Sequence, residues 1–159
     1  MNANDARIAR IYVARVGCTV EDPAPNSYSP LPARFDLILQ AKAGAVLGGS
    51  GADYTLTIVA INDDCAVSVP ELAPKGSPFC EEWTEADGWR PTGREYVKTS
   101  CGDQDGICRY EICVPHGLTG QFHYNVRLVS ANFEVVSFAR SNPFLLVPAV
   151  PWPPRPDDR

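Results

Sequence analysis

Half of the six cysteines of this chain fall within residues 100–117 (SCGDQDGICRYEICVPHG). Cysteine thiolates and histidine nitrogens are the preferred ligands of structural zinc, so the first chemistry to consider is a zinc site. Its ligands would be Cys101, Cys108, Cys113 and His116. The spacing argues against zinc, because structural sites usually start from two cysteines about two to four residues apart. On a strand, moreover, Cys108 and Cys113 point to opposite faces. We therefore predict that the chain holds no metal ion or other cofactor.

The DQDG segment at 103–106 also resembles the acidic part of a calcium-binding loop. Aligning Gly106 with the invariant glycine of such a loop places Cys101 at the first ligand position. The last position, where calcium loops carry a glutamate, then falls on Ile112. Both ends of the loop therefore lack the oxygen ligands that calcium requires, and we expect no calcium site.

A β-hairpin explains the same stretch better, with DQDG as its four-residue turn. Cys101 would then lie opposite Cys108, and Tyr96 would lie further along the first strand. Directly opposed residues have Cβ atoms about 4.5–5.5 Å apart, close to the separation that a disulfide needs. The pair Cys101 and Cys108 is therefore either a disulfide or two adjacent buried thiols, and the redox compartment decides between them.

Catalysis would need a nucleophile and a base, and Cys113 and His116 could form such a pair across a turn. No third residue that would orient the histidine is recognisable. The other histidine, His123, falls on the polar face of a predicted strand. The sequence also contains none of the motifs of serine hydrolases, P-loop proteins, dinucleotide-binding enzymes or zinc proteases. We predict that the chain is not an enzyme; a small enzyme or zinc protein built on residues 101–116 is the third alternative.

Length and charge limit the partners of the chain. Its 159 residues suit one domain, and its net charge of −5 argues against nucleic acid, which requires a cationic face. No apolar run is long enough to insert into a membrane. Arginines interrupt the N-terminal apolar residues, so we predict no signal peptide and a cytoplasmic location by default. If a leader had been removed, the protein would instead be extracellular or part of a virion.

Alternating apolar and polar residues predict an all-β protein of about seven to nine antiparallel strands, with no convincing helix. The clearest strands are 34–42 and 54–61, in which one face is apolar and the other polar. Residues 70–93 break every periodicity and are predicted to form a long irregular loop. Residues 149–159 are rich in proline, which cannot join a central strand. We expect one sandwich domain over 1–148 and an extended tail over 149–159.

The segment LTGQFHYNV resembles the corner that opens the penultimate strand of immunoglobulin-like domains. The positions that carry the resemblance are Leu118, Gly120, Phe122, Tyr124 and Val126. Phe122 and Tyr124 stand where such domains often have the corner tyrosine and the disulfide cysteine. The resemblance extends over residues 118–147 and implies an antiparallel immunoglobulin-like β-sandwich, without implying a particular function.

Two segments are candidate partner-binding surfaces. The long loop combines aromatic residues with arginine, the residue types that anchor protein interfaces, and the tail is an extended segment that loses little entropy on docking. The predicted contact residues are Trp83, Trp89, Arg90, Tyr96 and Trp152. Trp83 and Trp89 could each equally cap the core, and the tail could equally be a disordered terminus.

These residues predict a non-catalytic protein-interaction or assembly module that binds a protein partner or further copies of itself. The alternative is a secreted, disulfide-stabilised domain that binds carbohydrate or another surface ligand, with Trp83 and Trp89 stacking on sugar rings.

Overall fold

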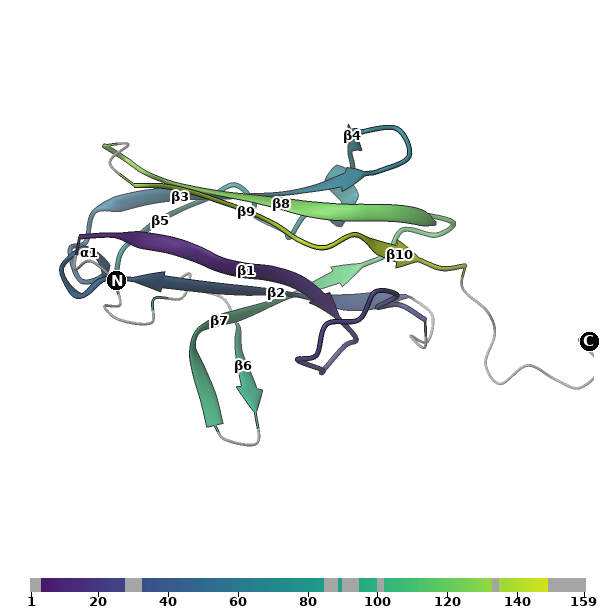
Figure 1. Cartoon of the computed structure of the whole chain (residues 1–159), viewed down its shortest axis with the longest axis horizontal. Helices are drawn as coiled ribbons and strands as arrows, with labels where there is room; N and C mark the ends of the chain where they lie inside the picture. The colour runs from purple at the N-terminus through teal and green to yellow at the C-terminus, as the bar shows by residue number, and fades with distance from the viewer. Residues whose placement is uncertain are drawn as a thin grey trace, which may run out of the picture.

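The computed structural model describes residues 4–27, 33–84, 89, 95–99, 102–132 and 135–148, with side chains left out for 95–99 and 102–106. Within these residues the chain forms ten strands, one turn of α-helix and one 3₁₀ turn. All strand pairings are antiparallel, which confirms the predicted all-β class. Figure 1 shows the strands in two layers, one above the other. No described helix is long and apolar enough to cross a membrane.

The first sheet has the order β1-β2-β7-β6. Its strands are β1 (Ala6–Ala14), β2 (Arg34–Ala43), β6 (Glu95–Thr99) and β7 (Gly102–Cys113). In β2, alternate residues Phe35, Leu37 and Leu39 are fully buried against the second sheet. This is the apolar face that the sequence pattern predicts for residues 34–42, since successive side chains of a strand point to opposite sides.

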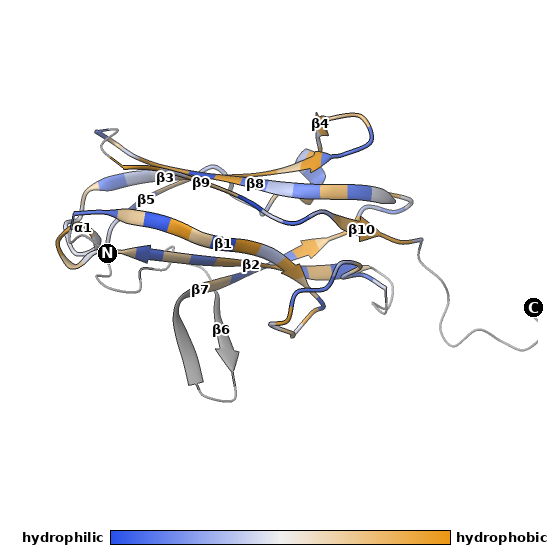
Figure 2. Ribbon diagram, in the orientation of Figure 1, coloured by the Kyte–Doolittle hydropathy of each residue, from blue (hydrophilic) through white to orange (hydrophobic). Residues whose placement is uncertain are grey.

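The second sheet is built on two long central strands, β3 (Asp53–Asn62) and β8 (Gly120–Ser130). Each outer edge is made by two consecutive short strands. These are β4 (Val67–Ser68) and β5 (Phe79–Glu82) on β3, and β9 (Val136–Arg140) and β10 (Phe144–Leu146) on β8. Figure 2 shows apolar and polar bands alternating along β1 and β8, as expected for strands with one buried face. The two interrupted edges bring the total above the predicted seven to nine strands.

The buried faces of both sheets form one core, into which Tyr124 of β8 projects. Its ring stacks on Phe144, with ring centres 5.5 Å apart. Its hydroxyl donates a hydrogen bond of 2.7 Å to the carbonyl of Leu72, in the 3₁₀ turn Pro70–Leu72. Burial raises the pKa of this hydroxyl well above its usual value. Tyr124 therefore ties the connection after β3 to the core.

The predicted hairpin turn at 103–106 is wrong. The strands β6 and β7 reverse between Thr99 and Gly102, so that residues 103–106 belong to β7. Tyr96, rather than Cys101, is the register partner of Cys108. The sequence could not decide this register, because the apolar residues of β7 face the core in either one.

The predicted loop 70–93 is more ordered than its sequence suggests. Residues 79–82 form β5, in which Phe79 pairs with Leu56 of β3. The ring of Phe79 stacks on Tyr110 across the core, with ring centres 5.8 Å apart. Four residues with two consecutive glutamates give no clear alternation, and the strand forms because β3 offers it a free edge.

Candidate functional site

The structure places both predicted tryptophans of the long loop in the core. Trp83 and Trp89 are 1% and 0% exposed, and their rings pack against Tyr54 with centres 4.4 and 5.1 Å away. Trp89 donates a hydrogen bond from Nε1 to the hydroxyl of Tyr54, which donates in turn to the carboxylate of Glu81. This is the core-capping role that the sequence left open for each ring. Neither ring offers a free face to a partner or a sugar.

The remaining predicted contact residues are not brought together by the described part of the chain. Arg90, Trp152 and Cys101 lie outside the described residues. Tyr96 lies on β6, where the backbone alone is described.

The predicted disulfide between Cys101 and Cys108 is not seen: Cys101 lies outside the described residues, and no disulfide joins any two of the described cysteines. Cys108 is fully buried and contacts the hydroxyl of Tyr110 at 3.6 Å. His116 is exposed in the turn that follows β7. Among the described residues, no group of three or more His, Cys, Asp or Glu lies close enough to hold a metal ion.

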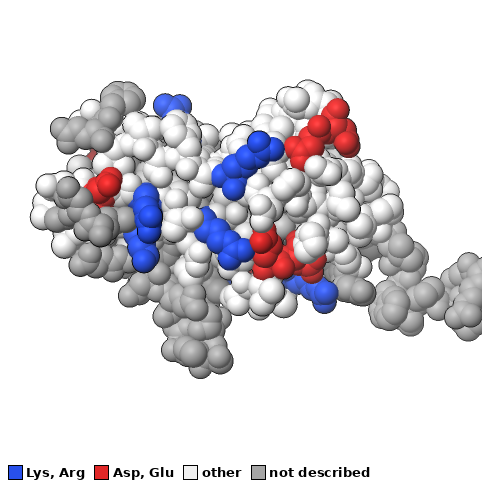
Figure 3. All heavy atoms as spheres, in the orientation of Figure 1, with Lys and Arg blue, Asp and Glu red and all other residues white. Residues whose placement is uncertain are grey.

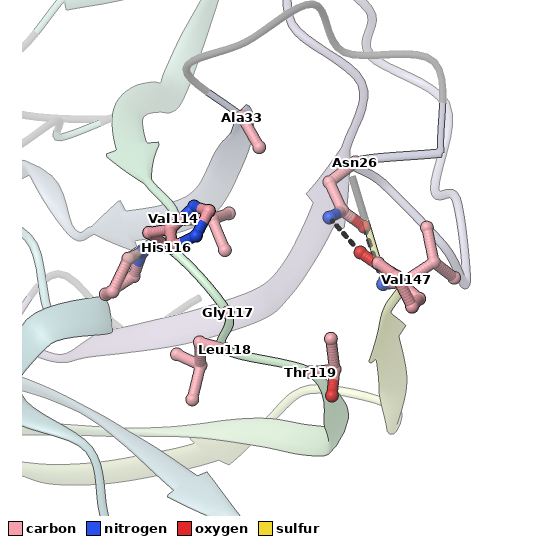
Figure 4. A pocket seen from close by; sticks show the side chains of 10 residues that line it. Asn26, Ala33, Val114, His116, Gly117, Leu118, Thr119 and Val147 are labelled. Carbon is pink, nitrogen blue, oxygen red and sulfur yellow. Dashed lines mark hydrogen bonds between the residues drawn. The ribbon is translucent and has the colours of Figure 1, made fainter. Parts of the chain in front are cut away.

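One end of the molecule contains a pocket of about 700 Å³, which we call the end pocket (Figure 4). Its walls come from the connection between β7 and β8, the segment before residue 28, and the residues that follow β10. The lining residues are Asn26, Ala33, Val114, Pro115, His116, Gly117, Leu118, Thr119, Val147 and Pro148. Most of these side chains are apolar, so the end pocket suits an apolar side chain or a short peptide rather than a charged group.

The walls of the end pocket are fixed by hydrogen bonds. The side-chain amide of Asn26 donates to the carbonyl of Val147 at 3.0 Å and accepts from its N–H at 3.1 Å. Figure 4 shows this pair on the side of the pocket opposite His116. The N–H of Leu145 donates to the carbonyl of Pro23 at 2.7 Å. A segment from the N-terminal part of the chain is thereby held against the last strand, and the end pocket is preformed.

A second surface lies on the outer face of the second sheet, where a shallow groove of about 620 Å³ crosses β3, β8 and β9. We call it the outer groove. The strand register places its side chains in two rows across the sheet. One row is Thr57, Arg127 and Phe138, and the next is Val59, Asn125 and Arg140. On the face seen in Figure 3, basic and acidic side chains are interspersed.

Next to the outer groove on β8, His123 and Asp63 form a hydrogen-bonded pair that the sequence did not reveal. The Nδ1 of His123 lies 2.5 Å from Oδ1 of Asp63, and the amide of Gln121 donates to Oδ2 at 3.1 Å. His123 is only 7% exposed, although it lies on the outward face of the sheet. Since the two residues are sixty positions apart and one sits in a turn, only the register of β3 on β8 could have paired them.

These contacts change the acidity of Asp63. Burial alone would raise the pKa of this carboxyl, but the hydrogen bonds from His123 and Gln121, with the charges of His123 and Arg140, hold the pKa below its usual value. A carboxyl with a lowered folded-state pKa stabilises the fold above its unfolded-state pKa, about 3.9. That contribution is lost as the pH falls through the lower, folded-state value.

We expect Asp63→Asn to destabilise the protein by about 1–2 kcal/mol at pH 7, because it removes a charge-assisted hydrogen bond. The difference between wild type and variant should shrink as the pH falls below about 4, where Asp63 of the unfolded chain becomes protonated, and it should be lost once the folded-state carboxyl is protonated as well. Urea unfolding at pH 7 and at pH 3 measures both values. Asp64→Asn changes the neighbouring exposed carboxyl and is the matched control. An equal loss at both pH values in Asp63→Asn would contradict the assignment.

No family model matches this chain, and comparisons with curated proteins and with solved structures likewise gave no match. The function is therefore inferred from the residues of the chain itself. Among the described residues, the end pocket and the outer groove are two concave surfaces that could bind a partner.

Proposed function

We propose that this chain is a non-catalytic assembly module of immunoglobulin-like fold, which associates with further copies of itself through the end that carries the end pocket. In this assembly the proline-rich segment of one copy, residues 149–159, occupies the end pocket of the next.

The order of the strands supports the immunoglobulin-like part of this proposal. Immunoglobulin-like sandwiches have strands A, B, E and D in one sheet and strands C, F and G in the other. With letters assigned in chain order, β1-β2-β7-β6 corresponds to A-B-E-D. The order β9/β10, β8, β3 and β5 corresponds to G-F-C with an added C′ strand. The buried Tyr124 then lies on strand F, where the sequence resemblance expects it.

The observation that carries the assembly proposal is that Pro148 lines the end pocket. Each copy therefore presents an apolar receptor directly beside the point where its own proline-rich segment begins. That segment, AVPWPPRPDDR, contains four prolines and Trp152. A proline-rich segment of eleven residues extends over about 30 Å, at about 3.1 Å per residue, which is long enough to reach a neighbouring molecule.

The chemistry of the two surfaces is complementary. Proline and tryptophan side chains are largely apolar and lose little conformational entropy on docking, so that an apolar, preformed pocket is a suitable receptor for them. Thr119 and His116 at the rim offer hydrogen-bonding groups for backbone carbonyls of a docked segment.

The test is the mass of the full-length protein in solution, measured by size-exclusion chromatography with light scattering over a range of concentrations. We expect wild type to form a dimer or larger oligomer. Trp152→Ala, which removes the largest apolar group of the segment, and Thr119→Arg, which fills the pocket rim, should both shift the mass toward the 17.3 kDa monomer. Val46→Arg, an equivalent change at an exposed position of α1 (Ala45–Gly48), which lies at the opposite end of the molecule from β10 in Figure 1, should have no effect. A wild type that stays monomeric at high concentration, or a Thr119→Arg variant that assembles normally, would overturn the proposal.

A further inference from the structure

We propose that the outer groove is a second binding site, specific for an acidic, extended segment of a partner protein. The site does not depend on the assembly proposed above, because the outer groove and the end pocket share no residue.

Two arginines of the outer groove have no ion-pair partner among the described residues. Arg127 and Arg140 are exposed, and neither makes an ion pair or side-chain hydrogen bond within the described part of the chain. Four other arginines of the described chain are paired with a carboxylate, among them Arg10 with Glu21 and Arg15 with Asp22. Arg140 lies near enough to Asp63 to affect its acidity, but that carboxylate is already bound by His123 and Gln121.

The positions of the two arginines favour a ligand that carries more than one negative charge. Arg140 is the register partner of Asn125, and Arg127 follows Asn125 by two residues on the same strand, so that the arginines are diagonal neighbours on one face. Diagonal neighbours on adjacent strands lie about 7–8 Å apart. Two like charges at this separation repel each other, and carboxylates placed between or beside them would relieve the repulsion.

The apolar part of the outer groove favours a peptide over a small anion. Phe138 is 69% exposed and is the register partner of Arg127, and Val136, two residues before it on β9, is 48% exposed. An exposed aromatic ring beside arginine is the combination that anchors protein interfaces. A groove of about 620 Å³ is also much larger than one phosphate or sulfate ion needs. The alternation of charged and apolar side chains matches a strand-like segment that alternates acidic and apolar residues.

The two exposed arginines of the outer groove stand out because the chain as a whole is negatively charged. The chain has a net charge of −5, which disfavours an acidic partner in general, so that such a partner is attracted where unpaired basic side chains gather. The outer groove therefore selects both the partner's charge and its position.

The probe for the test is a fluorescein-labelled peptide, Asp-Phe-Asp-Leu-Asp-Phe-Asp, titrated with the full-length protein and followed by fluorescence anisotropy. We expect saturable binding that weakens with added salt, because exposed charge pairs are screened. The peptide with lysine in place of aspartate should not bind. The double variant Arg127→Gln and Arg140→Gln should weaken binding about tenfold or more, as should Phe138→Ala. Arg7→Gln, which removes one exposed arginine from the first sheet, is the control and should bind like wild type.

Absence of saturable binding of the acidic peptide would overturn the proposal, as would equal binding by the double variant. Competition by inorganic phosphate distinguishes the remaining source of negative charge. If phosphate displaces the peptide completely and Phe138→Ala binds like wild type, the outer groove is a site for small oxyanions and the proposal is wrong. Monomeric protein that binds the peptide would refute the assembly proposal alone.

Discussion

Trp89→Ala is expected to destabilise the protein by about 3–5 kcal/mol, the usual loss when a buried tryptophan is truncated. The ring of Trp89 is fully buried and packs edge-on against Trp83, with ring centres 4.8 Å apart. Truncation leaves a cavity beside Trp83 and removes the hydrogen bond from Nε1 to the hydroxyl of Tyr54. Because small domains are stable by only about 5–15 kcal/mol, a large part of the total stability would be lost.

Urea unfolding followed by tryptophan fluorescence measures this effect, and Phe138→Ala is the matched control. Phe138 is also aromatic, but it is largely exposed, so its truncation should change the free energy of unfolding by about 0.5 kcal/mol or less. If Trp89→Ala and Phe138→Ala prove equally mild, the assignment of Trp89 to the core is wrong.

The difference in stability between Trp89→Ala and Phe138→Ala also determines how binding experiments on variants of residues 70–93 must be interpreted. A loss of binding in a Trp83 or Trp89 variant would follow from partial unfolding and would not identify a contact residue. A loss of binding in Phe138→Ala, with unchanged stability, would identify one. The two aromatic groups differ in burial, and only burial tells a core residue from an interface residue of the same type.

The sequence was sufficient to predict the elements whose own residues alternate. Strands β2 and β3 show a clear period of two, and their buried faces are the predicted ones. A strand was also predicted from about residue 120 onward, and the structure forms β8 there, with Tyr124 buried on it. These predictions succeed because the pattern within one strand fixes which of its faces meets the core.

Predictions failed where an outcome depends on a partner strand. The register of β6 on β7 makes Tyr96 the partner of Cys108, where the sequence analysis expected Cys101. Each strand alone has the same residue pattern in either register. Strand β5 was missed because its pairing with β3 outweighs its own weak pattern. The His123–Asp63 pair and the two rows of the outer groove likewise exist only through the pairing of neighbouring strands. Sites made by adjacent strands are therefore the part of this protein that a single sequence does not reveal.

The second large effect is expected at Asp36, which is 1% exposed although it lies on the outward face of β2. Residues 15–22, which follow β1 and which we call the covering segment, cover this face. The Oδ2 of Asp36 accepts a hydrogen bond of 2.8 Å from the N–H of Gly17 and lies 3.3 Å from Nε of Arg109. Beneath the same cover lies a small second core of Tyr12, Ala14, Ile38 and Ile107. Asp36 therefore connects the covering segment to β7.

We expect Asp36→Ala to destabilise the protein by about 3–5 kcal/mol, because it removes the carboxylate from a largely buried guanidinium. A buried pair can nevertheless contribute little net stability, since both charges lose their hydration. The double variant Asp36→Leu and Arg109→Met should therefore be much closer to wild type than Asp36→Ala. Urea unfolding of wild type, of the single variants Asp36→Leu and Arg109→Met, and of the double variant gives the coupling energy between the two residues directly. A double variant as unstable as the sum of its single variants would contradict the ion pair. If the double variant is instead nearly as stable as wild type, the covering segment is held in place mainly by the second core and by the hydrogen bond from the hydroxyl of Tyr12 to the carbonyl of Thr19.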